Sequence, residues 1–306
     1  MIKAFLIHLA HKIKFHIQPK KPFSGRGILL KWAHKILTEP TGPLTIKTLD
    51  GFKLRIDPVK DKGVERVIYF TGTYEAGTLH VLGHLLKAGN IYLDVGSNIG
   101  LMAIFAARNV GKKGQVHAFE PEPETYTILE HNCRINSLKN IVLNNVALGA
   151  EEKEATIYAN LDTNRGAASL VRQDGSAGKK ISVTTLDAYL AAHSIGRIQV
   201  MKIDIEGYEM EMLKGATKLL SSKDAPVICI EYSRDVEHTG DATDIYDFIK
   251  GINEYRVFKF SVWKGEVCPL QEVYSKADLP QHDNIFCFLP QQLLQAVPSL
   301  FKNEKT

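Results

Sequence analysis

The stretch Ile91-Tyr-Leu-Asp-Val-Gly-Ser-Asn-Ile-Gly100 decides how the rest of this chain is expected to fold. Its first five residues are apolar or aromatic except for Asp94, as in a strand that is buried on both faces of a sheet. Gly96 and Gly100 follow as turn residues, and residues 101–109 are an apolar-rich helical segment. This order of strand, glycine turn and helix predicts a nucleotide-type binding crevice, because the free N–H groups of the helix start point at whatever lies over the turn.

The glycine turn differs at two places from the dinucleotide-binding template Gly-x-Gly-x-x-Gly. Counted from Gly96, Asn98 stands where the second glycine should be and Leu101 where the third should be. The second glycine of the template lets a pyrophosphate approach the backbone, and the side chain of Asn98 obstructs that approach. Asp94 also puts a carboxylate beside the turn. A cationic or zwitterionic ligand without phosphate, such as S-adenosylmethionine, therefore fits this turn better than NAD does.

A second acidic residue, Glu120, follows the predicted strand at residues 115–119. At this place a carboxylate can accept hydrogen bonds from both ribose hydroxyls of an adenosine. Bonds of this kind to a charged group contribute about 1.5–3 kcal/mol each. The alternative is a solvated carboxylate ahead of the proline-rich helix start at residues 121–123, and next to the glycine turn we favour the ribose interpretation.

The composition is that of an ordinary globular protein. Of the 306 residues, 44% are hydrophobic and 24% are charged, and this length accommodates one large α/β domain with an appendage. The four cysteines have neither metal-ligand nor redox spacing, so we interpret them as small core residues in a reducing compartment. The formal net charge of +4 is too small to indicate a nucleic acid partner by itself.

The N-terminal segment is distinctly basic. Residues 1–38 contain eight Lys or Arg and no Asp or Glu, and apolar residues recur at helical spacing in the first half. The apolar run is too short, and too broken by histidines, to span a bilayer or to serve as a signal peptide. Two interpretations stay open: a helix that docks on its own domain, or a basic amphipathic helix on an anionic membrane surface or an acidic lipid-linked substrate. We expect a cytoplasmic protein, held at the inner membrane surface under the second interpretation.

The pattern divides the chain into three parts. Residues 1–43 form the basic amphipathic extension, residues 44–90 a hairpin and helices that cover the crevice, and residues 91–306 the binding domain. Strands alternate with helices in the binding domain, which predicts parallel pairing with right-handed crossovers. The variable loops expected to shape a substrate pocket are residues 160–180 and 233–244.

Carboxylates recur at the ends of the predicted core strands. Asp94, Glu120, Asp204 and Glu231 each follow the apolar run of a different strand. In an open α/β sheet, ligands bind at the carboxyl ends of the strands. Two such charges ~4 Å apart repel by ~4 kcal/mol at an effective dielectric constant near 20. A ring of this kind suits a cation with polar hydroxyls, which is the main argument from the residues for a sulfonium cofactor.

With these features in place, the chain resembles the FkbM-type family of S-adenosylmethionine-dependent methyltransferases. The resemblance covers about residues 44 to 290 and is carried by six blocks: Gly72-Thr-Tyr-Glu75, Leu93-Asp-Val-Gly-Ser-Asn-Ile-Gly100, Phe119-Glu-Pro121, Asn145-Val-Ala-Leu-Gly149, Thr185-Leu-Asp187 and Lys202-Ile-Asp-Ile-Glu-Gly-Tyr-Glu209. It implies an α/β class I methyltransferase (Rossmann-like) fold, a seven-stranded sheet with helices on both faces, plus a small N-terminal helical and hairpin extension.

The same resemblance implies O-methylation with S-adenosyl-L-methionine as the cofactor. The expected acceptor is a hydroxyl group, of a sugar in a glycolipid or polysaccharide or of a secondary metabolite. The resemblance places the methionine end of the cofactor near the glycine turn, the ribose at Glu120 and the adenine beside the Val146–Ala147 backbone. The implied cofactor site consists of Glu75, Asp94, Gly96, Ser97, Asn98, Gly100, Glu120, Val146 and Ala147.

The reaction is an in-line displacement, in which the protein supplies alignment, exclusion of water and help with the leaving proton. Asp204, Glu206 and Glu231 are the candidate catalytic residues near the acceptor. Asp204 and Glu206 could instead only satisfy the free N–H groups of a helix start. His238 and His282 are the other candidate bases.

We expect no metal ion at Asp204. Catechol-type enzymes add an Asp-Asn pair at the next strand end, where this chain has Glu231-Tyr232. A nucleobase methyltransferase would place a Pro-Pro-aromatic block after the fourth strand, and this chain has Ile205-Glu-Gly-Tyr208 there, so we expect no nucleic acid substrate. The remaining alternatives are an NAD-dependent oxidoreductase and a non-catalytic module that binds a membrane surface or partner through its basic N-terminus.

Overall fold

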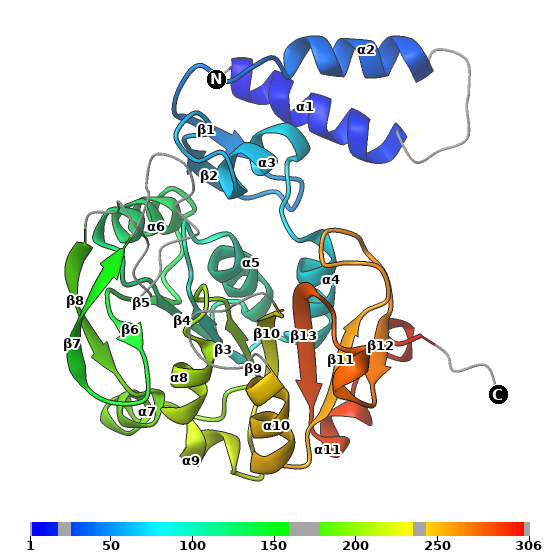
Figure 1. Cartoon of the computed structure of the whole chain (residues 1–306). Coiled ribbons are helices and arrows are strands. Elements are labelled where there is room, and N and C mark those ends of the chain that lie inside the picture. Colours follow the sequence, from blue (N-terminus) through cyan, green and yellow to red (C-terminus); the bar gives the residue numbers. More distant parts are fainter. Residues whose placement is uncertain (1, 18–25, 159–177, 235–242, 303–306) are drawn as a thin grey trace.

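The computed structural model describes residues 2–17, 26–158, 178–234 and 243–302. Its centre is a sheet of eight strands, beside which lie a separate three-stranded sheet and a two-stranded hairpin with the N-terminal helices (Figure 1).

The central sheet has the strand order β5-β4-β3-β9-β10-β13-β11-β12. Its five parallel strands, formed by the apolar runs seen in the sequence, are β3 (Ile91–Val95), β4 (Gln115–Phe119), β5 (Ile141–Asn144), β9 (Val200–Ile203) and β10 (Val227–Ser233). Strand order reverses between β3 and β9, so the crevice at their carboxyl ends is the expected ligand site of an open α/β sheet.

The far edge of the sheet is antiparallel and has one strand more than predicted. β13 (His282–Phe288) pairs with β10 and with β11 (Arg256–Phe260), and β12 (Leu270–Val273) adds an eighth strand outside β11. The prediction of seven strands was therefore wrong by one. β12 is a short edge strand in which only the two end residues are buried, so it lacks the continuous apolar run by which the core strands were recognised.

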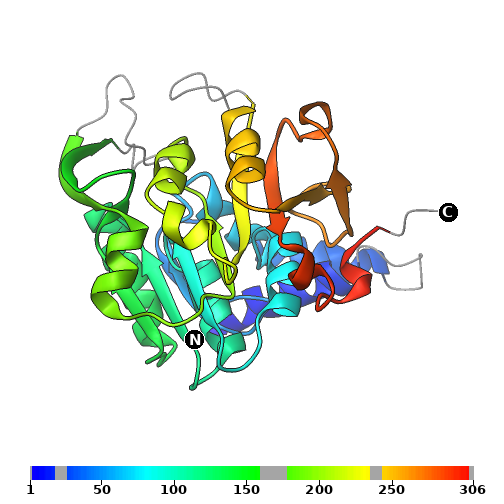
Figure 2. The same cartoon turned by 90° about the horizontal axis from the view of Figure 1, so that it is seen from below.

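Helices cover both faces of the sheet, as predicted. On one face lie α4 (Ala76–Leu85), α5 (Leu101–Val110) and α6 (Pro123–Ile135); on the other lie α7 (Leu186–His193), α8 (Glu209–Lys214), α9 (Thr217–Leu220) and α10 (Thr243–Ile252) (Figure 2). Successive strand residues alternate between the two apolar cores: Tyr92 packs into the first, Leu93 and Val95 into the second. Cys229 and Cys287 are unpaired residues of these cores, as expected.

A small side sheet extends beyond β5. It has the order β6-β8-β7, with β6 (Ala147–Leu148), β7 (Lys153–Tyr158) and β8 (Gly178–Thr184). The predicted variable loops, residues 160–180 and 233–244, fall largely outside the described residues. The C-terminal part adds the short helix α11 (Pro290–Leu293) and the 3₁₀ turns Lys276–Asp278 and Pro298–Leu300.

The N-terminal helices dock on their own chain. The region consists of α1 (Ile2–Ile17), α2 (Arg26–Ile36), β1 (Leu44–Lys47), β2 (Lys53–Ile56) and α3 (Val64–Thr71), and α1 and α2 lie at its outer end (Figure 1). Ile7, Ala10 and His11 of α1 are fully buried, and His11 Nε2 lies 2.7 Å from the carbonyl oxygen of Tyr69. Within the described residues, no helix is both long enough and apolar enough to cross a bilayer.

Candidate active site

One cleft lies over the carboxyl ends of β3, β4, β9 and β10. The start of α4, the segment just before it and the side sheet complete its walls. All the predicted site residues except Asp94 and Gly100 line this cleft: Glu75, Gly96, Ser97, Asn98, Glu120, Val146, Ala147, Asp204, Glu206 and Glu231.

The two glycines of the turn are required by packing against the rest of the chain. Both have left-handed backbone, with φ of 82° at Gly96 and 93° at Gly100. A Cβ at Gly96 would lie 1.8 Å from the carbonyl oxygen of Asp204, and a Cβ at Gly100 would lie 2.6 Å from Cδ1 of Leu129 on α6. Gly100 therefore belongs to the packing of α5 on α6, and only Gly96 faces the cleft.

Glu120, at the end of β4, is held in place by backbone groups. Its Oε2 accepts a hydrogen bond from the N–H of Asn98 at 2.8 Å, and its Oε1 accepts one from the N–H of Glu122 at 3.0 Å. Burial raises the pKa of Glu120 to about 7, although these two bonds lower it. Each carboxylate oxygen can accept a second bond, so Glu120 can receive two hydroxyl donors from a ligand.

Asp94 lies behind the glycine turn rather than on the cleft surface. Its Oδ1 accepts a hydrogen bond from the hydroxyl of Tyr92 at 3.1 Å, while among the described residues its Oδ2 has no partner. Burial raises the pKa of Asp94 to about 6, and the ammonium group of Lys202 opposes this shift.

Unsatisfied acceptors test whether the cleft fits the expected cofactor. Within the described residues, Oδ1 of Asn98 and Oδ2 of Asp94 are buried without a hydrogen-bond partner, and a buried polar group in that state is destabilising. Asn98 lines the cleft, so a ligand that brings an N–H or O–H donor would satisfy its Oδ1, and an ionised phosphate would not. The wall opposite is apolar, with Val146, Ala147 and Leu148 from the entrance of the side sheet. This combination fits S-adenosylmethionine, which offers an ammonium, ribose hydroxyls and an adenine ring.

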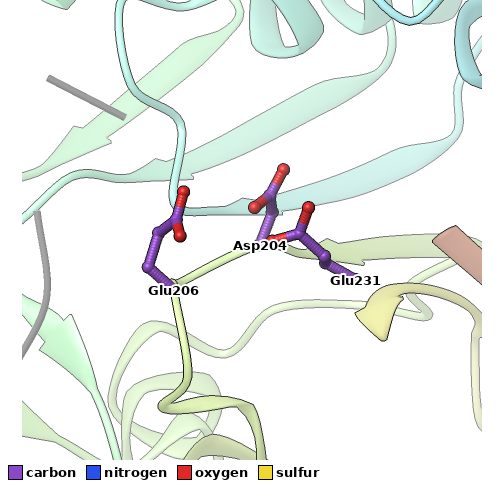
Figure 3. Close-up of side chains that lie close together, drawn as sticks. All are labelled: Asp204, Glu206 and Glu231. Atoms are coloured by element: carbon purple, nitrogen blue, oxygen red, sulfur yellow. The ribbon is translucent and has the colours of Figure 1, made fainter. Parts of the chain in front are cut away.

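The other half of the cleft brings three carboxylates together (Figure 3). Asp204 directly follows β9, Glu206 lies in the next loop, and Glu231 is on β10; one oxygen from each lies within 4.8 Å of the other two. Glu206 and Gly207 both have left-handed backbone, with φ of 54° and 93°. Such backbone is strained for a glutamate and concentrates at functional sites.

Two buried lysines stand next to these carboxylates, and the sequence analysis did not assign either of them to the site. Lys202 Nζ lies 2.5 Å from Oδ2 of Asp204, and Lys264 Nζ lies 2.7 Å from Oε1 of Glu231. In this half of the cleft the protein itself therefore supplies positive charge next to the strand-end carboxylates, which the sequence analysis had ascribed to the cofactor alone. Lys202 could have been noticed, because it interrupts the apolar run of β9. Lys264 lies in the loop between β11 and β12 and carries no such signal.

The charges divide the three carboxylates by pKa. Burial alone would raise the pKa of Asp204, but Lys202 and Lys264 hold it well below its ordinary value. Burial and the negative charge of Asp204 raise the pKa of Glu231. Removal from solvent, together with Asp204 and Glu209, raises the pKa of Glu206 to about 7. Glu206 is also the exposed member of the three, so it is the one that can exchange a proton with a ligand near neutral pH.

The alternative role of Asp204 and Glu206 as helix caps has less support. Helix α8 begins only at Glu209, so both residues precede its first turn. The N–H of Ile205 donates to Oε1 of Glu209 at 3.0 Å, so the carboxylate of Glu209 holds the loop that precedes α8.

The remaining candidates of the sequence analysis lie at the periphery. Glu75 lines the cleft, but its oxygens are bound by Lys264 Nζ at 3.0 Å and by Nδ2 of Asn284 at 2.8 Å. His282 Nε2 lies 3.4 Å from Oε1 of Glu231, and His238 falls outside the described residues. The absence of a resident metal stays a prediction, now on the ground that lysine ammonium groups already stand beside Asp204 and Glu231.

Comparison with known proteins identifies the family of this chain. The family profile described as "Methyltransferase FkbM domain" matches residues 94–260, just over half of the chain. The chain is similar to "Hexuronic acid methyltransferase AglP" of Haloferax volcanii, with 26% identity over 161 residues, 53% of this chain and 64% of that protein. It is also similar to "Methyltransferase 1" of Beauveria bassiana, with 24% identity over 144 residues, 40% of this chain and 57% of that protein. The chain thus spans 57–64% of the length of these two relatives.

Among solved structures, the chain is similar to a methyltransferase FkbM from Methylobacillus flagellatus. The TM-score is 0.46 at 17% identity, over 72% of this chain and 52% of that one. An O-methyltransferase of tomaymycin synthesis, TomG from Streptomyces achromogenes, has a TM-score of 0.41 at 13% identity, over 69% of this chain and 77% of that one.

Proposed function

The chain belongs to the methyltransferase FkbM family, and on that premise we propose that it transfers a methyl group from S-adenosyl-L-methionine to a hydroxyl group of a sugar. Family membership confirms the predicted resemblance, the methyltransferase class and the cofactor. The observation that carries the proposal is the two-sided cleft, with unsatisfied acceptors on one side and, on the other, a carboxylate that titrates near neutral pH.

On the cofactor side, Glu120 would hold the ribose hydroxyls, and Asn98 would accept a hydrogen bond from a donor of the methionine end. Val146 and Ala147 would border the adenine. When bound, S-adenosyl-L-methionine supplies a methyl group that its sulfonium already activates for nucleophilic attack. The protein therefore needs only to align the acceptor oxygen and remove its proton.

On the acceptor side, we assign the general base to Glu206. A general base works best when its pKa is close to the operating pH and when the substrate can reach it, and Glu206 meets both conditions. Asp204 is the fixed negative charge of the group, since Lys202 keeps it ionised.

The sugar acceptor and a membrane location are supported by two further observations. One relative bears the name of a hexuronic acid methyltransferase. The outer surface of α1 and α2 exposes Phe5, Leu9, Ile28 and Leu29 within a segment that has eight basic and no acidic residues. Apolar side chains surrounded by lysines bind anionic lipid surfaces. A glycan linked to a lipid would meet the enzyme at such a surface.

The reaction is tested by two measurements. Isothermal titration should detect binding of S-adenosylhomocysteine and none of NADH, and binding of NADH alone would favour the oxidoreductase. Labelled S-adenosyl-L-methionine is then offered with p-nitrophenyl β-D-glucuronide, which carries both hydroxyls and a carboxylate. A methyl ether survives mild alkali and a methyl ester does not. An alkali-stable product supports a hydroxyl acceptor, and an alkali-labile one contradicts it.

Membrane contact is tested by co-sedimentation of the full chain with phosphatidylglycerol vesicles and with phosphatidylcholine vesicles. Phe5→Ser with Ile28→Ser removes two side chains that are 65% and 74% exposed and should abolish binding to the anionic vesicles. Val262→Ser, at a residue 63% exposed in the β11–β12 loop, is the matched control. Equal binding by all three proteins would end the membrane proposal.

A further inference from the structure

Lys264 links three parts of the molecule that are far apart in the sequence. Its ammonium group binds Oε1 of Glu75 at the start of α4 (3.0 Å) and Oε1 of Glu231 on β10 (2.7 Å). Lys264 itself comes from the β11–β12 loop and is only 8% exposed. A buried lysine with two carboxylate partners is uncommon, since the ion loses its hydration and has to regain it from the protein.

The backbone of the β11–β12 loop is fixed on both sides of this lysine. The carbonyl oxygen of Lys264 accepts a hydrogen bond from the N–H of Gly77 at 2.9 Å, and the N–H of Lys264 donates to Oδ1 of Asp283 at 3.1 Å. A Cβ at Gly77 would lie 2.4 Å from the carbonyl oxygen of Glu266, so the loop and the first turn of α4 are in close contact. The ammonium group is therefore held at a fixed place rather than carried on a free loop.

Lys264 is one of two buried ammonium groups on the acceptor side. Charged and titratable groups surround it from the segment before α4, from β9 and the loop after it, and from α8, β10 and β13. They are Tyr74, Glu75, Lys202, Asp204, Glu206, Glu209, Cys229, Glu231, His282 and Asp283. Lys202 binds Asp204 and leaves Glu231 to Lys264. The positive charge of Lys264 also acts on Glu206, the exposed carboxylate of the cluster, and favours its ionised form.

We propose that Lys264 is a positioning residue of the acceptor side, whose ammonium group sets how many protons the Asp204–Glu206–Glu231 cluster binds near neutral pH. This proposal rests on the proposed function and deepens it: Lys264 sets the pH range in which Glu206 can take the proton of the acceptor. It acts through Glu231 and Glu206 and need not touch the substrate.

The test compares the full chain with Lys264→Met, Lys264→Arg and the double variant Lys264→Met with Glu231→Gln. Methyl transfer to p-nitrophenyl β-D-glucuronide is measured from pH 6 to 9. In Lys264→Met, kcat at pH 7 should fall ~5-fold, while KM for S-adenosyl-L-methionine stays within ~3-fold. The acid limb of the kcat profile should move to higher pH by about one unit, because Glu206 loses a stabilising positive charge.

The other two variants separate charge from packing. Lys264→Arg keeps the charge and should hold the acid limb of the parent. In the double variant a neutral amide replaces Glu231, whose pKa burial and Asp204 already raise, so its acid limb should stay with that of Lys264→Met. A return to the parent position would contradict the role of Glu206. A Lys264→Met profile that superimposes on the parent profile would overturn the proposal.

A second readout needs no acceptor. Without Lys264, two buried carboxylates lack their cation, so the folded protein should bind a proton that the unfolded chain releases. Stability should then fall more steeply in Lys264→Met than in the parent as pH rises from 6 to 9, and thermal unfolding measures this. If the parent binds S-adenosylhomocysteine but does not methylate the glucuronide, the choice of acceptor fails, and the unfolding curves still decide the role of Lys264: parallel curves would reject it.

Discussion

The two halves of the cleft use carboxylates in different ways. On the cofactor side, Glu120 is held by two backbone N–H groups, Asp94 by the Tyr92 hydroxyl, and among the described residues acceptor atoms there are left without partners. On the acceptor side, Asp204 and Glu231 each bind a buried lysine. The first half is completed by its ligand, whereas the second carries its own countercharge.

This difference indicates which half of the cleft needs a positive charge or hydrogen-bond donors from its ligand. Within the described residues Asp94 and Glu120 form no ion pair, so this half favours a ligand that donates hydrogen bonds or brings a positive charge. Carboxylates that already face ammonium groups gain less from such a ligand. They suit the proposed reaction, in which the acceptor gives up a proton.

Removal of the proposed general base should have the largest effect of all the variants. Glu206→Gln keeps the size of an exposed side chain and removes its basicity, so kcat should fall by ~100-fold or more. Affinity for S-adenosylhomocysteine should stay within ~2-fold, because Glu206 lies outside the cofactor half. Steady-state kinetics and isothermal titration measure the two effects. Glu211→Gln on α8 is the control, and unchanged turnover in Glu206→Gln would return the role of base to Asp204 or Glu231.

Glu120→Gln should mainly lower the affinity for the cofactor, in contrast to Glu206→Gln, which should mainly lower kcat. An amide accepts through only one of its two heavy atoms, so at least one charge-assisted hydrogen bond to the ribose is lost, worth ~1.5–3 kcal/mol or ~10–100-fold in Kd. The control is Glu124→Gln in the first turn of α6, which is solvent-exposed and paired with Lys179. If Kd for S-adenosylhomocysteine changes equally in both variants, Glu120 is not the ribose ligand.

The pH dependence of cofactor binding should report the same carboxylate. In the free protein the pKa of Glu120 is raised to about 7, and ribose hydroxyls bind its ionised form, so binding releases a proton. Affinity for S-adenosylhomocysteine should therefore rise from pH 6 to 8, by up to ~10-fold per pH unit below the pKa. Titrations at several pH values would show this slope, and Glu120→Gln should flatten it. A wild-type affinity that falls over this range would contradict the assignment.

Metal removal should have the smallest effect. Because lysine ammonium groups already face Asp204 and Glu231, EDTA should change the rate by less than ~2-fold. Loss of activity in EDTA with recovery in magnesium would show that the three carboxylates also hold a cation.

The position of the cleft was predictable because parallel strands bring their ends to one edge of the sheet. The apolar runs that end at Asp94, Glu120, Asp204 and Glu231 were visible one by one, and the right-handed crossovers place those ends together. The resemblance to the family predicted the cofactor. It also assigned residues such as Asn98 and Glu206 to the same edge of the sheet.

The features of the site that the sequence did not predict depend on contacts that leave no local pattern in the sequence. Lys264 reaches the site because β11 and β12 form a hairpin at the far edge of the sheet, and the pairing of β12 itself is encoded by only two buried residues. The glycines of the turn were assigned to the ligand, although a Cβ at either of them would meet the protein itself. Such effects follow from three-dimensional packing and not from spacing along the chain.

The 1.8 Å separation between an added Cβ at Gly96 and the carbonyl oxygen of Asp204 also restricts how this enzyme can change. The backbone of the glycine turn, which we propose holds the cofactor, and the backbone that presents the acidic cluster are in direct van der Waals contact, so neither can be remodelled without displacing the other. New acceptor preferences are therefore easier to obtain by varying the surrounding walls, at the start of α4 and in the side sheet, than by altering this junction.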